Sequence, residues 1–169
     1  NDPSYASIES QFPLVPGDDI ADAENMYNSM GRGHREEGFD ASYEYLMNNE
    51  YAQTWLRHDA ALLVVFVSDE EEQSDDHFPT VDGYISWYQG LRSGSVYLSS
   101  IVNLDPSESL CNTNAYNNGD RYIEATEHLT GQIVDICSED WSAGVIDAAT
   151  RLEPYEFLAL THEPVEESI

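Results

Sequence analysis

The sequence predicts an α/β fold: an open, doubly wound parallel sheet with helices on both of its faces. The first observation is an unbroken apolar run over residues 60–67, rich in β-branched side chains. Because nothing in this run alternates, both of its faces require burial, which is typical of a central strand in a parallel sheet. The second observation is that further strand-like runs are separated by stretches with helical spacing, which favours parallel, right-handed connections.

In the N-terminal half, residues 1–19 are polar and rich in proline, and we expect an extended lead-in. Asp18 or Asp19 can cap a short helix that runs to residue 30. A second helix is expected over residues 35–47, where Phe39, Tyr43 and Leu46 have helical spacing. Residues 48–58 then form a connection to the apolar run.

In the C-terminal half, helices and strands alternate. The expected elements are a helix from residue 80 or 82 to 91, a strand over 96–102, a polar loop over 103–118, a helix over 119–129, a strand over 132–136, a helix over 140–150 and a last strand over 157–161. At 169 residues one domain is the default, and we place it at residues 20–152. Residues 153–169 would hold the last strand and the start of a following linker or domain.

The charge of the chain excludes two classes of partner. There are 33 acidic and six basic residues, all six of them arginine, for a net charge of −27. Such a chain repels nucleic acid and anionic lipid. The acidity is explained either by a surface that stays soluble in salty water, or by binding of several divalent cations through carboxylates, and the two explanations are compatible.

The two cysteines, Cys111 and Cys137, match no zinc pattern. We expect one disulfide in an oxidising, extracellular compartment, and the alternative is two free buried thiols. No run of about 18 apolar residues occurs, so no membrane span is expected. The chain has no signal peptide and does not begin with Met, so we interpret it as a mature, cleaved or partial product.

A dense group of oxygen ligands follows the apolar run. In open α/β sheets, ligands gather beyond the carboxyl ends of the strands. A hard divalent cation, Mg²⁺ or Ca²⁺, prefers such oxygens, although a solvated acidic loop explains the same residues. The candidate metal ligands are Asp69 first, and then Ser68, Glu70, Glu72, Asp75 and Asp76.

Several blocks in order resemble a von Willebrand factor type A domain of the secreted kind found in bacterial surface proteins. The resemblance covers about residues 20–152. The blocks are residues 33–41 (Gly33, Glu36, Glu37, Gly38, Phe39, Ala41), 56–60, 64–74, 96–102 with Cys111, 119–131 (Gly119, Arg121, Tyr122, Thr130, Gly131) and 135–141 (Asp135, Ile136, Cys137, Ser138, Asp140, Trp141).

The resemblance implies a metal-ion-dependent adhesion site, in which a partner carboxylate completes the coordination of a divalent cation. In that family the site uses an Asp-x-Ser-x-Ser loop, a Thr from a second loop and an Asp after the fourth strand. Only Asp69 matches, as the Asp of the third loop. The Asp-x-Ser-x-Ser loop is missing, and no Thr lies near residues 31–35, where Ser29 is the nearest hydroxyl.

By the same resemblance, the strands before residue 20 are missing, and the run at residues 62–67 would be left as an apolar edge. We therefore expect a protein partner or companion chain to supply the missing strands, or assembly into a homo-oligomer or filament. No hydrolase, metalloprotease or phosphate-loop motif occurs, so we expect no enzyme. The expected function is a non-catalytic extracellular adhesion module. The alternative is a structural subunit of a cell-surface appendage or filament with a degenerate metal site.

Overall fold

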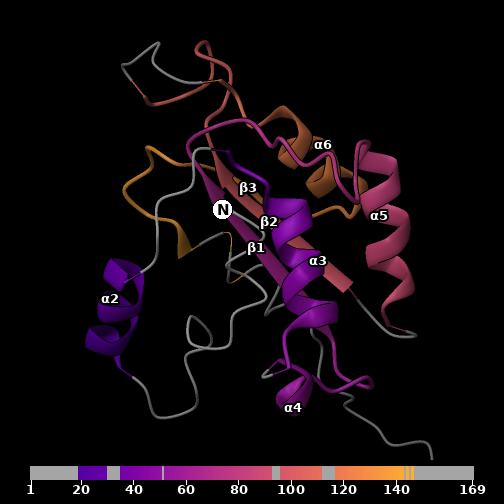
Figure 1. Cartoon of the computed structure of the whole chain (residues 1–169). Helices are drawn as coiled ribbons and strands as arrows, with labels where there is room; N and C mark the ends of the chain where they lie inside the picture. The colour runs from indigo at the N-terminus through magenta and orange to yellow at the C-terminus, as the bar shows by residue number, and fades with distance from the viewer. Residues whose placement is uncertain are drawn as a thin grey trace, which may run out of the picture.

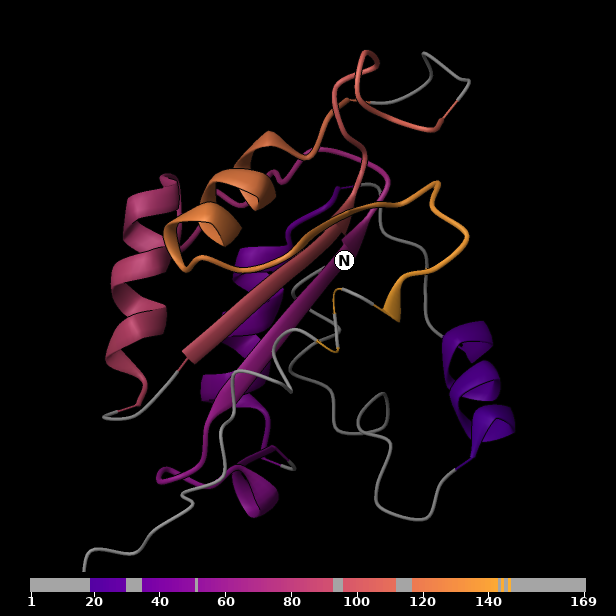
Figure 2. The same cartoon turned by 180° about the vertical axis from the view of Figure 1, so that it is seen from behind.

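The computed structural model describes residues 19–29, 35–50, 52–92, 96–111, 117–142, 144 and 146. Figure 1 shows the arrangement of the elements, and Figure 2 shows it from behind. In chain order they are α2 (Ile20–Ser29), α3 (Gly38–Asn48), α4 (Ala52–Trp55), β1 (Leu62–Ser68), α5 (Val81–Gly90), β2 (Val96–Val102), α6 (Asp120–His128) and β3 (Ile133–Asp135). The expected last strand at 157–161, and nearly all of the expected lead-in, lie outside these residues.

The three strands form one parallel sheet in the order β1-β2-β3. β1 and β2 pair along their whole length, from Leu62 opposite Val96 to Ser68 opposite Val102. The α/β class and the parallel sheet are therefore confirmed. In the described sheet β2 lies in the middle and β1 at one edge. This differs from the central position that the apolar run alone predicts, and it agrees with the edge position that the resemblance implies.

Helices α3, α5 and α6 pack on one face of this sheet. Their buried side chains form a single apolar core with Leu62 and Phe66 of β1 and with Leu98 and Val102 of β2. Side chains alternate along a strand, so these residues share one face. In Figure 1, α3 lies in front of the strands, and in Figure 2 it lies behind them.

Aromatic rings fill the centre of this core. Phe39 of α3 stacks on Tyr84 of α5 with ring centroids 4.1 Å apart, and Tyr122 of α6 meets it edge-on at 5.6 Å. The hydroxyl of Tyr88 lies within hydrogen-bond distance of the Leu62 and Tyr97 carbonyl oxygens, at 3.2 and 2.7 Å. Tyr88 therefore ties α5 to β1 and β2 at once.

The opposite face of the sheet is partly exposed at β1, whereas Ser99 and Ile101 of β2 on the same face are buried. It carries Leu63, Val65 and Val67 of β1, and Val67 is 46% exposed. Near β3, Gly144 lies against Val134 and Ile101. Helices were expected on both faces of the sheet, and the structure shows them on one face, where α3, α5 and α6 pack. On the other face, only helical residues among 142–146 are described.

The element boundaries differ from the predicted ones by a few residues. β2 matches its predicted bounds, and β1 and β3 lie within two residues of theirs. The connection expected over 48–58 contains the short helix α4, whose first amide is capped by Asn49 Oδ1 at 2.9 Å. Within the described ranges, no helix is long and apolar enough to cross a membrane.

Candidate functional site: the carboxyl edge of the sheet

Polar residues gather at the carboxyl edge of the sheet, where the three strands end. β1 ends at Ser68 and is followed by Asp69; Asn103 follows β2; Asp135 closes β3. The Asn103 side-chain amide donates a hydrogen bond to the Asp69 carbonyl oxygen, which joins the ends of the first two strands. We call these four residues the rim.

The middle of the acidic loop, residues 69–76, caps helix α6 from outside the helix. The Glu71 carboxylate accepts hydrogen bonds from the amides of Asp120 and Arg121, each at 3.1 Å. Gly119, at the N-cap position, has no side chain that could do this. A carboxylate at a helix N-terminus also interacts favourably with the helix dipole. Glu71 therefore replaces the missing cap.

The same part of the loop caps helix α3. Glu72 Oε1 accepts a hydrogen bond from the amide of Phe39 at 3.3 Å, and Ser74 Oγ accepts one from the amide of Asp40 at 3.0 Å. Asp40 in turn accepts hydrogen bonds from the amides of Asp76 and His77, each at 3.1 Å. Loop and helix thus accept hydrogen bonds from each other's backbone amides.

Glu72 is a buried carboxylate held by an arginine. Its side chain is fully buried, and Oε2 lies 2.8 Å from Arg121 Nη1. Burial raises the pKa of Glu72, although hydrogen bonds from Ser74 and the charge of Arg121 act against this rise. A buried charge is stable only when it is paired and hydrogen-bonded, so the Glu72 carboxylate depends on Arg121.

Arg121 also fixes the backbone of the loop. Its guanidinium donates hydrogen bonds to the carbonyl oxygens of Glu72, Ser74 and Phe78 at 3.3, 3.0 and 2.7 Å. Arg35 contacts the exposed side of the loop. It donates a hydrogen bond to the Gln73 carbonyl oxygen at 2.8 Å and forms an ion pair with Asp75 at 3.2 Å. Of the arginines that the structure describes, Arg35 and Arg121 therefore both hold this loop.

The ends of the loop differ from its middle. Asp69 and Asp76 are exposed, and Glu70 is half-buried. With the residues described, the carboxylates of these three form no hydrogen bond or ion pair. The Ser68 hydroxyl is already engaged, because it exchanges hydrogen bonds with the backbone of Glu70.

Of the six candidate metal ligands, the structure therefore places Glu72 in an ion pair with Arg121, Asp75 beside Arg35, and Ser68 in a local turn. Among the described residues, the carboxylates of Asp69, Glu70 and Asp76 have no hydrogen-bond or ion-pair partner; Asp69 and Asp76 are exposed and Glu70 is half-buried. Binding of a cation by Asp69 remains a prediction. The carboxylates without a partner are the ones that could serve as its ligands. Sequence reasoning did not identify the residues that organise this edge, which are Glu71, Asn103, Asp135 and Arg121. A signal existed for Glu71, since Gly119 begins a helix without a capping side chain.

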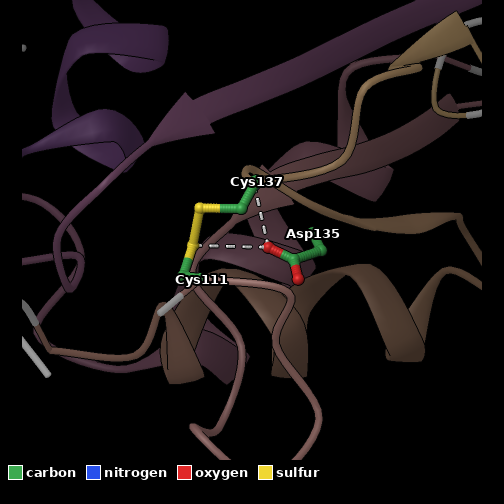
Figure 3. A group of neighbouring side chains, drawn as sticks. All are labelled: Cys111, Asp135 and Cys137. Atoms are coloured by element: carbon green, nitrogen blue, oxygen red, sulfur yellow. Dashed lines mark hydrogen bonds between the residues drawn. A yellow bond between two sulfur atoms is a disulfide. The ribbon is translucent and has the colours of Figure 1, made fainter. Parts of the chain in front are cut away.

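The expected disulfide between Cys111 and Cys137 is present, with Cα atoms 5.3 Å apart. It joins the loop after β2 to the turn after β3, beside Asp135 (Figure 3). The buried Asp135 carboxylate accepts hydrogen bonds from the amide of Leu110 and, at 2.9 Å, from that of Cys137. Asp135 and the disulfide together hold the two loops at the rim.

Comparison of the chain with protein-family models, with curated proteins and with solved structures found no significant match.

Proposed function

We propose that this chain is a non-catalytic protein-interaction module that assembles through the outer edge of β1. One observation carries the proposal: in the sheet formed by the described residues, the most apolar strand lies at an edge, with Val67 46% exposed. An apolar edge strand presents unpaired backbone groups to any second strand. This is the behaviour of a structural subunit of a surface assembly.

In this proposal, the strand that pairs with the β1 edge is β1 of a second copy of the chain. Two β1 edges can pair antiparallel about a two-fold axis, which would join two three-stranded sheets into one. The resemblance to von Willebrand factor type A domains supports an occupied edge, because the strand that β1 resembles pairs there with the first strand of the domain. The disulfide fits an oxidising extracellular compartment.

The test compares two lysine variants by analytical ultracentrifugation. Val67→Lys puts a charge on the edge strand, and Leu110→Lys puts the same charge on a loop residue that is 68% exposed. Copies carrying a charge of −27 repel each other, so the measurement is made in high salt. We expect the wild type and Leu110→Lys to associate and Val67→Lys to stay monomeric. A monomeric wild type, or a Val67→Lys variant that associates equally well, contradicts the proposal.

A metal-dependent adhesion module is the second candidate, and the open carboxylate of Asp69 at the end of β1 favours it. Melting temperature is measured while Ca²⁺ or Mg²⁺ is added, with Asp69→Asn as the variant and Asp59→Asn, just before the same strand, as the control. Adhesion through this site requires a cation-dependent rise that Asp69→Asn removes and Asp59→Asn retains. If the cations leave the wild-type melting temperature unchanged, this candidate is eliminated.

A further inference from the structure

The surroundings of the disulfide contain more ligand atoms than a disulfide needs. The two sulfur atoms and a carboxylate oxygen of Asp135 all lie within 4.8 Å of one another. Cys111 Sγ is 3.8 Å from Asp135 Oδ1 and 3.6 Å from Asn103 Oδ1. Figure 3 shows the Asp135 carboxylate directed at the sulfur of Cys111. Two sulfurs and two oxygens thus lie close together, contributed by the loop after β2 and by the end of β3.

These distances suit a tetrahedral zinc ion once the sulfur–sulfur bond is opened. Zn–S bonds of about 2.3 Å and Zn–O bonds of about 2.0 Å separate sulfur and oxygen ligands by about 3.5 Å. The Asp135 carboxylate is already oriented by the amides of Leu110 and Cys137, so little ordering remains when it binds a metal. Thiolates together with a carboxylate favour zinc over calcium or magnesium.

We propose that reduction of the Cys111–Cys137 disulfide creates a zinc site formed by both thiolates and Asp135, with Asn103 Oδ1 or a water in the fourth position. A dithiol reductant supplies two electrons and two protons and leaves as its own cyclic disulfide. The protein disulfide becomes two thiols, and both lose their protons to solvent when Zn²⁺ binds. The oxidised protein has no thiolate to offer and binds no zinc there.

The consequence is that one cross-link between the loops replaces another. In either state the loop after β2 stays joined to the end of β3, and Asn103 stays beside the Asp69 carbonyl oxygen. The inference is independent of the β1 edge, since Val67 takes no part in it.

The test uses Co²⁺ as an absorbing substitute for Zn²⁺. Cobalt bound to thiolates gives an intense charge-transfer absorption, which cobalt on the many surface carboxylates does not give. We expect the band in reduced wild-type protein at one equivalent, its loss on adding Zn²⁺, and no band in the oxidised protein. A reduced wild type without the band overturns the proposal.

Two carboxylate variants distinguish a direct ligand of the metal from the general attraction of cations to an acidic surface. Asp135→Asn keeps one oxygen for the amide of Cys137, replaces the oxygen that accepts from Leu110 with an NH₂ group, and removes the charged ligand. We expect a Co²⁺ affinity lowered about tenfold or more. Glu108→Gln removes an exposed charge from the same loop and should bind as the wild type does. The melting temperature of the oxidised Asp135→Asn protein checks that the loops still fold. Equal Co²⁺ affinity in a folded Asp135→Asn variant also overturns the proposal.

Discussion

β1 and the acidic loop after it have one side that faces the helices and one side that faces away from them. Apolar and acidic residues occur on both sides, but their surroundings differ. On the side toward helices α3, α5 and α6, the side chains of Phe66, Glu71 and Glu72 are buried or hydrogen-bonded. On the open side, Val67 and Asp69 face outward. Neighbours in the sequence therefore differ in their surroundings: one set is packed or hydrogen-bonded within the fold, and the other is exposed.

The largest contrast is expected between Phe66→Ala and Val67→Ala. Phe66 is 6% exposed in the aromatic core, so its truncation leaves a cavity and costs about 3–5 kcal/mol of unfolding free energy. Val67→Ala removes half-exposed surface and should cost less than about 1 kcal/mol. Urea unfolding of both variants measures the difference. Similar losses would show that the open side is buried after all.

The next contrast is between the two arginines that hold the acidic loop. Arg121→Ala leaves the buried Glu72 carboxylate without its partner and should cost about 3 kcal/mol, because an unpaired buried charge is strongly destabilising. Arg35→Ala removes an exposed side chain whose ion pair is screened by solvent, and it should cost much less than Arg121→Ala. Thermal or urea unfolding provides the comparison, and an Arg35 variant as unstable as the Arg121 variant would refute the distinction.

The smallest effect is a pH dependence carried by Glu72. Burial raises its folded-state pKa above the ordinary value of 4.5, so the folded protein holds this proton more tightly than the unfolded chain. The stability linked to Glu72 is therefore fully present below pH 4.5 and is lost as pH rises through the raised pKa. Glu72→Gln has no such titration. We expect the wild type to gain stability relative to Glu72→Gln between about pH 7 and about pH 4, as measured by urea unfolding. If the wild type loses stability relative to Glu72→Gln as the pH is lowered, the prediction is wrong.

Much of the fold could be predicted from local pattern. Residues 96–102 form a strand as expected, because a short β-branched run between turn residues has few alternatives. The order of strands was less predictable. An unbroken apolar run such as residues 60–67 shows that a strand is apolar on both faces, but gives no information on its neighbours in the sheet.

The candidate site could be predicted only by position. Asp69 at the end of β1 follows from a general rule of parallel sheets. The roles of Glu71 and Glu72 could not follow from the sequence, because capping of α3 and α6 depends on two helices that meet the loop in space. Arg121 lies 49 residues from Glu72 in the chain, and nothing in the spacing pairs them.

Backbone hydrogen exchange along β1, read by NMR in dilute protein and again in high salt, tests the open edge most directly. In the dilute monomer we expect alternate β1 amides, those directed away from β2, to exchange with little protection, while the amides directed at β2 are protected. Under conditions of assembly the same outward amides should become protected. The account is contradicted if they are already protected in the monomer, or if they stay unprotected once the copies have assembled.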